Sequence, residues 1–153
     1  MAKRHLTTLW HLAWMDRWLL LEATLWLGVA RIAILTVPFR KVAKHLGEQM
    51  AESPHSDQTA FRTRLSRISW AVRTMSRSTP WESACLAQAL AAKAMLRCRG
   101  ITSTLYLGLA KEQKDGQSAL LAHAWLRSGS MILTGGQGKD QYTVVATFAE
   151  KSA

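Results

Sequence analysis

Residues 79–100, TPWESACLAQALAAKAMLRCRG, predict a helix with a cysteine, Cys85, close to its start. Two starts fit the stretch. Ser83 is a good N-cap and would make Cys85 the second helical residue, whereas a capping box that opens at Thr79 would start the helix earlier. Gly100 is a good stop signal at the other end. The choice of start matters because a thiol in the first turn lies at the positive end of the helix dipole.

A histidine stands out downstream, His123, within the apolar run LLAHAWL of residues 120–126. This run predicts a buried strand, which would hold the imidazole in a fixed orientation. A cysteine at a helix start followed by a histidine on a strand is the order found in papain-like and transglutaminase-like cysteine enzymes. This order makes Cys85 a candidate nucleophile and His123 its candidate base, and a structural thiol and a core histidine are the alternative.

Length and charge limit the organisation of the chain. Its 153 residues, 48% of them apolar, suit one domain with a helical extension. We place the extension at residues 1–50 and the domain at residues 57–150. The formal net charge of +10 is concentrated in the first half of the chain. Such a field favours an acidic peptide, a nucleic acid or an anionic membrane, and does not choose among them. The second cysteine, Cys98, is predicted to be a free thiol like Cys85, because one helix holds the two far apart.

Residues 6–37 are apolar and predict a long helix, in which Trp14, Trp18 and Trp26 follow a helix-core spacing. Glu22 and Arg31 interrupt the apolar run, so we do not expect a membrane span. A buried or partner-facing helix is favoured, and a helix lying on anionic lipid is the alternative. A proline at position 38 ends this helix, a short basic helix follows over 39–46, and 48–58 is predicted to be a loop.

The remaining elements predict an α+β fold. Residues 59–76 carry an apolar stripe at helical spacing, and strands are predicted over 102–109, 119–127, 130–133 and 142–148. The arginines of the 59–76 segment and its end lie mainly off the stripe. They form either a solvated face or a surface for an acidic peptide: Arg62, Arg64, Arg67, Arg73 and Arg77.

No cofactor or metal ion is predicted. The two thiols lack a zinc-ligand spacing, and the glycine-rich segment 134–138 does not follow a strand and open a helix as a phosphate-binding loop does. Nucleic-acid binding is not expected either, because no recognised motif is present.

Several segments together resemble the lasso-peptide leader peptidases, a family of transglutaminase-like cysteine proteases. The resemblance covers nearly the whole chain. It rests on residues 17–23 (RWLLLEA), 35–43 (LTVPFRKVA), 85–92 (CLAQALAA), 100–105 (GITSTL), 107–109 (LGL), 122–126 (AHAWL) and Phe148. It implies N-terminal helices followed by a transglutaminase/papain-like core, in which the helix with the cysteine packs on a small antiparallel sheet.

The resemblance also implies an activity. Such enzymes remove the leader from a ribosomally made lasso-peptide precursor, through an acyl-enzyme on Cys85 with His123 as general base. A separate leader-recognition protein and an ATP-dependent lasso cyclase are the implied partners. The implied location is the cytoplasm, with peripheral contact at the inner membrane face through the N-terminal helices. Two other functions stay open: acyl transfer or amide hydrolysis on another substrate, and a non-catalytic basic binding module.

The third catalytic residue departs from the family pattern. The family has an aspartate about twelve residues after the histidine, where this chain has Gly135. Either a carbonyl group or a side chain such as Thr134 orients the imidazole, or Asp140 reaches back from the loop. The Cys85 backbone N–H is the expected oxyanion donor, and Gln88 lies on the same helical face as the thiol.

Overall fold

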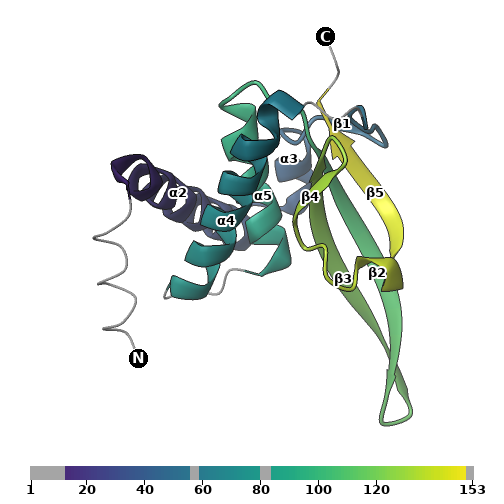
Figure 1. Cartoon of the computed structure of the whole chain (residues 1–153). Coiled ribbons are helices and arrows are strands. Elements are labelled where there is room, and N and C mark those ends of the chain that lie inside the picture. Colours follow the sequence, from purple (N-terminus) through teal and green to yellow (C-terminus); the bar gives the residue numbers. More distant parts are fainter. Residues whose placement is uncertain (1–12, 56–58, 80–83, 151–153) are drawn as a thin grey trace.

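The computed structural model describes residues 13–55, 59–79 and 84–150. The long helices precede the four longer strands, and the short strand β1 lies between the helices in the chain (Figure 1). The helical elements are α2 (Trp14–Thr36), α3 (Phe39–Ala43), η1 (Thr59–Phe61), α4 (Arg62–Ser78), α5 (Cys85–Arg97) and η2 (Lys139–Gln141). The strands are β1 (Glu48–Gln49), β2 (Thr104–Lys114), β3 (Gln117–Ser128), β4 (Met131–Thr134) and β5 (Thr143–Ala149). The predicted α+β fold class is confirmed.

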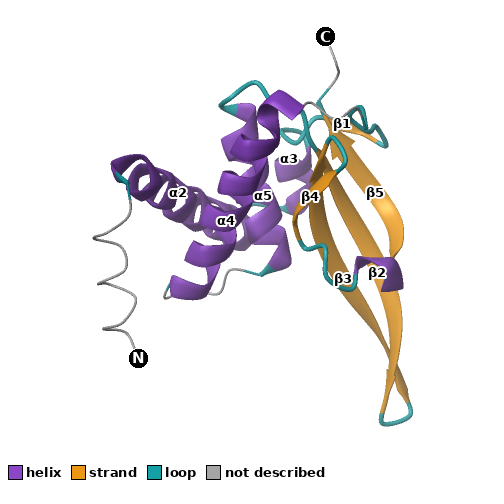
Figure 2. Cartoon of the chain, viewed as in Figure 1, coloured by secondary structure: helices purple, strands orange, loops and turns teal. Residues whose placement is uncertain are grey.

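The strands form one antiparallel sheet in the order β1-β5-β2-β3-β4. Figure 2 shows the helices as a layer on one side of this sheet. The β2–β3 hairpin reaches past the helices and closes at Asp115 and Gly116, both at positive φ (54° and 77°). The turn lies where the sequence predicts it, but β2 extends through the charged residues before it. Strand β1 was not predicted, because two exposed residues carry no periodic pattern.

Helix α5 is the centre of the core. Its alanines allow close approach of α2 and α4 on one side and of β3 and β4 on the other. The predicted stop is correct: Gly100 has φ +67°, and the N–H groups of Gly100 and Ile101 donate to the carbonyls of Arg97 and Leu96. This pair of hydrogen bonds is the Schellman motif that a glycine at this position favours.

The start of α5 differs from both predictions. Ala84 is the N-cap, so Cys85 is the first helical residue and not the second. Thr79 instead ends α4, where its N–H donates to the carbonyl of Met75, so a capping box opening at Thr79 is wrong. Ser83 itself lies outside the described residues.

Helix α4 buries the predicted apolar stripe. Leu65, Ile68 and Val72 are buried, and Phe61 and Met75 pack against them at its ends. The stripe was predictable because three- and four-residue steps place these side chains on one face of a helix.

Helix α2 has two apolar faces. The inner one belongs to the core. On the outer one, Trp14 and Trp18 are 69% and 64% exposed, so these two side chains do not belong to the core, and the partner-facing alternative stays a prediction. Both acidic residues of α2 are paired, Asp16 with an arginine of α4 and Glu22 with Arg99 at both carboxylate oxygens. The bond to Glu22 raises the pKa of Arg99.

By length and composition alone, α2 also meets the requirements of a membrane span, which core helices of soluble proteins meet as well. The helix ends at Thr36, before the proline, as predicted. The inner face of α2 is part of the main core. The domain boundary that we place near residue 50 stays a prediction.

Candidate active site

Cys85 lies at the N-terminus of α5 and is half-buried. The first hydrogen bond of the helix runs from the Gln88 N–H to the Ala84 carbonyl. The N–H of Cys85 therefore precedes the intrahelical ladder, where backbone donors point out of the helix. Negative charge that develops beside the thiol would lie at the positive end of the helix dipole.

The imidazole of His123, on β3, is held by a backbone carbonyl. Its Nε2 lies 2.7 Å from the carbonyl oxygen of Gly135. A carbonyl oxygen can only accept, so Nε2 carries a proton, and in the neutral imidazole Nδ1 is then the nitrogen with the lone pair. The ring also packs against Trp125 and Tyr142, with centroid distances of 5.8 Å and 4.8 Å. The carbonyl and the two aromatic rings fix the tautomer and the orientation of the imidazole.

Cys85 and His123 line one cavity of about 550 Å³. Its walls come from α4, α5, β3, β4 and the loop that follows β4. Gln88, which lies on the same helical face, lines it one turn beyond the thiol. Elements distant in sequence thus bring the two residues singled out in the sequence to one cavity.

The position of the family aspartate cannot hold a side chain in this structure. Gly135 has φ +69°, and a Cβ there would overlap the carbonyl oxygen of Ala124. The Gly135 backbone carbonyl, twelve residues after His123, binds the imidazole instead. A backbone carbonyl group therefore orients the imidazole, which is one of the alternatives that the sequence left open.

Neither side chain considered for this role holds the imidazole. The Asp140 carboxylate is 91% exposed and pairs at 2.8 Å with its neighbour Lys139, so the structure does not bring it to His123. Thr134 lines the cavity, but its buried hydroxyl has no hydrogen-bond partner among the described residues.

Some residues around the site were not singled out for it from the sequence. Tyr142 packs on the imidazole, and nothing in its sequence context signals this. Arg73 and Arg77 line the cavity from α4, although the sequence distinguishes them in no way from the other arginines of that helix. Cys98 is an exposed free thiol at the end of α5, as predicted.

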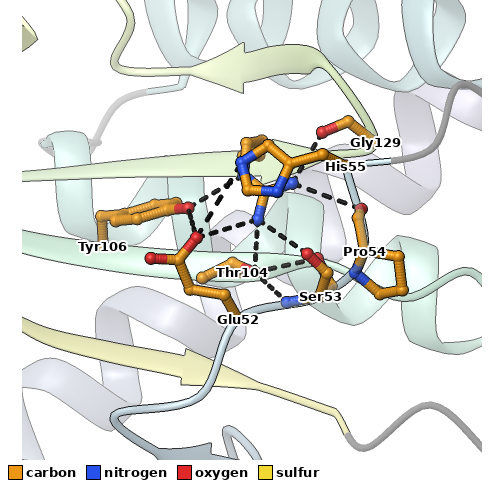
Figure 3. Close-up of polar contacts among 8 residues, drawn as sticks. Glu52, Ser53, Pro54, His55, Thr104, Tyr106 and Gly129 are labelled. Carbon is orange, nitrogen blue, oxygen red and sulfur yellow. Dashed lines mark hydrogen bonds and ion pairs between the residues drawn. The ribbon is translucent and has the colours of Figure 1, made fainter.

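A second polar cluster surrounds the buried side chain of Arg127, also on β3 (Figure 3). Its guanidinium donates to the Tyr106 hydroxyl at 2.8 Å and to the carbonyls of Ser53 and Gly129 at 2.8 Å and 2.7 Å. The Tyr106 hydroxyl donates in turn to Glu52 at 2.8 Å. Burial raises the pKa of Tyr106. The hydrogen bonds of this cluster hold the segment after β1 against the sheet.

The fold places a cysteine at a helix start against a sheet that carries a histidine, an arrangement compatible with cysteine peptidase or acyltransferase activity. The sequence profile of the transglutaminase-like superfamily matches residues 33–147, and the chain belongs to this superfamily. No curated protein and no solved structure matches it.

Proposed function

We propose that this protein is a cysteine peptidase that removes the leader from a lasso-peptide precursor. The observation that carries the proposal is the shared cavity of Cys85 and His123, in which Nε2 of His123 is bound to the Gly135 carbonyl and Nδ1 is left available as a base. Membership of the transglutaminase-like superfamily supports the chemistry. The resemblance described above supports the substrate.

In the first step, Nδ1 of His123 takes the proton of the Cys85 thiol, and Sγ attacks the carbonyl carbon of the scissile peptide bond. The oxyanion that forms accepts a hydrogen bond from the Cys85 backbone N–H. When the intermediate collapses, the C–N bond breaks and His123 gives its proton to the leaving amine. The leader is then a thioester on Cys85, and the core peptide leaves with a free N-terminal amine.

In the second step, water attacks the thioester and His123 takes its proton. The C–S bond breaks, the thiol regains a proton, and the leader leaves with a new carboxylate. The free amine of the core is what an ATP-dependent cyclase needs in order to close a ring. An amine in place of water would give acyl transfer, which changes the mass of the product.

The outer face of α2 supports docking of a separate leader-recognition protein. Its exposed apolar side chains recur at three- and four-residue steps and include Trp14, Trp18, Leu21, Leu25, Val29, Ile32 and Leu35. A continuous exposed apolar stripe on a helix is typical of a surface that a partner covers, and a helix of the partner can pack along it. We therefore assign the face to a helix of that protein.

The double substitution Leu21→Asp/Leu25→Asp tests this docking by size-exclusion chromatography with the partner. Val144→Asp/Val145→Asp is the matched control, because it removes two exposed apolar side chains from β5. Loss of the complex in the α2 variant alone is expected. Flotation of wild type with anionic vesicles, or a dimer of the protein by itself, would reassign the face to a membrane or to a second copy.

Mass spectrometry of the precursor tests the activity. The candidate precursor, taken from the same gene neighbourhood, is incubated with this protein and the leader-recognition protein, with Cys85→Ala and His123→Ala in parallel. We expect leader release by wild type and by neither variant. Release by all three would contradict the site, and a product joined to an amine would indicate acyl transfer. Binding without any conversion would favour the non-catalytic module.

A further inference from the structure

The arginines of α4 have different surroundings, although the sequence presents them alike. Arg67 pairs with an aspartate of α2, and Arg64 lies over the ring of Phe61 at 5.9 Å. Arg62 lines a different cavity, beside the turn after β3. Arg73 and Arg77 line the cavity of Cys85 and His123. Two of the five thus face the candidate site.

Arg73 and Arg77 are four residues apart and therefore project from the same face of α4. Within the described parts of the chain, neither guanidinium has an acidic partner, and no acidic side chain lines the cavity. Both side chains are exposed, so water solvates them in the free protein, and among the described residues they bring two positive charges to the cavity with no acidic side chain in its lining.

The opposite wall carries a second unpartnered polar group. The Thr134 hydroxyl is buried, lines the same cavity, and has no hydrogen-bond partner among the described residues. Buried hydroxyls normally have a partner, so this one leaves a hydrogen bond that a water molecule or a ligand atom in the cavity can make. A carboxylate suits the cavity, because guanidinium groups bind carboxylates through paired, charge-assisted hydrogen bonds.

We propose that Arg73 and Arg77 form an anionic subsite beside Cys85, which selects acyl donors that carry a side-chain carboxylate close to the scissile carbonyl. The identity of the donor as a peptide rests on the proposed function. The charge selectivity at the thiol does not, because it is a property of the cavity itself.

Alkylation of Cys85 by iodoacetate and by iodoacetamide tests the subsite without any peptide. The reagents differ in charge, and the ratio of their rate constants reports the potential at Sγ. Both rates are measured in a Cys98→Ser background for the parent, for Arg73→Glu/Arg77→Glu and for Arg62→Glu/Arg64→Glu. The last variant is the matched control, because it makes the same change in net charge on the same helix.

We expect the iodoacetate/iodoacetamide ratio to fall about five- to tenfold in Arg73→Glu/Arg77→Glu and to stay within about twofold in the control. An unchanged iodoacetamide rate verifies that the thiol and the fold are intact, and Arg73→Gln/Arg77→Gln repeats the test without introducing acids. Equal falls in both Glu variants, or no fall in either, would overturn the subsite.

A peptide assay separates this proposal from the peptidase itself. If the leader is released, replacing acidic residues around the cleavage site by their amides should slow wild type and leave Arg73→Gln/Arg77→Gln unaffected. Release with an unchanged alkylation ratio would overturn the subsite and leave the peptidase. A changed ratio without release would retain the subsite and overturn the peptidase.

Discussion

Strand β3 carries two polar centres that differ in how completely their hydrogen bonds are satisfied. Around Arg127, the guanidinium meets carbonyl, hydroxyl and carboxylate oxygens. Around His123, within the described parts of the chain, one ring nitrogen and not the other has a partner, and a buried hydroxyl nearby has none. A saturated cluster stabilises a fold, and an unsaturated one leaves atoms for a substrate.

The two centres are joined by a row of ring contacts. His123 stacks on Trp125, Trp125 on Tyr106 at 5.4 Å, and Arg127 lies over the Tyr106 ring at 5.8 Å. Proximity along the same strand therefore does not make both centres functional. Substitutions in one centre should change stability, and substitutions in the other should change activity.

The largest effect is expected from Cys85→Ala. Leader release should fall on the order of 10³-fold or more, because no acyl-enzyme can form. The free energy of unfolding should change by only about 1 kcal/mol, since the thiol is half-buried and small. Urea denaturation and the mass-spectrometric assay measure the two quantities, with Cys98→Ala as the control. A variant that keeps its activity would contradict the comparison.

Arg127→Met should show the opposite pattern. Removing the guanidinium leaves the carbonyls of Ser53 and Gly129 without their donor, and the cost is about 3–5 kcal/mol. Activity per folded molecule should stay near wild type, because Arg127 does not line the cavity. Arg97→Met is the control, since this exposed guanidinium binds the carbonyl of His45 at the surface. Equal costs in urea denaturation would mean that the buried cluster stabilises little.

Gly135→Ala should affect both stability and activity. The added Cβ overlaps the Ala124 carbonyl and displaces the carbonyl that holds His123, so we expect a loss of about 2–4 kcal/mol and slower leader release. Gly138→Ala is the matched control, with a similar positive φ but open space around the Cβ, and should cost about 1 kcal/mol. Similar stabilities and activities of the two variants would show that the Gly135 carbonyl does not orient the imidazole.

A smaller effect on the free energy of unfolding should distinguish a hydroxyl that has a hydrogen-bond partner from one that has none. Thr134→Val should change the free energy of unfolding by less than about 0.5 kcal/mol, because no hydrogen bond within the described chain is lost. Ser69→Ala should cost about 1 kcal/mol, since the Ser69 hydroxyl donates to the Leu133 carbonyl at 2.6 Å. A costly Thr134→Val, measured in the same urea titration, would indicate that this hydroxyl is already satisfied.

The smallest effect is a pH dependence from Tyr106. Its pKa is raised by burial above the ordinary value of 10.0, so the folded protein keeps the phenol proton where the unfolded chain has released it. The free energy of unfolding of wild type should therefore fall as pH rises above 10, relative to Tyr106→Phe. Parallel stabilities of the two proteins across that range would indicate that the buried cluster does not shift the phenol.

Local patterns predicted the elements that depend on neighbouring residues. The stripe of α4, the stop at Gly100 and the turn at Asp115 each follow from spacing or from a positive φ. The Cys85 and His123 pair was also found from sequence, because each residue type lies in a distinctive element.

Features that depend on distant contacts could not be predicted. Strand β1 and the segment after it are held by residues far along the chain, such as Thr104 and Arg127. Counting residues led to Gly135, but only the loop geometry shows that its carbonyl replaces a side chain. Spacing likewise predicted the helix α2, whereas the exposed position of Trp14 and Trp18 depends on how that helix packs.

The most direct test of an activated nucleophile uses the two thiols of the protein against each other. Peptide mapping after brief iodoacetamide treatment gives the alkylation rates of Cys85 and Cys98 in wild type and in His123→Ala. We predict that half-buried Cys85 reacts faster than exposed Cys98, and that His123→Ala slows Cys85 alone. A faster Cys98, with Cys85 indifferent to the loss of His123, would contradict the proposed catalytic pair.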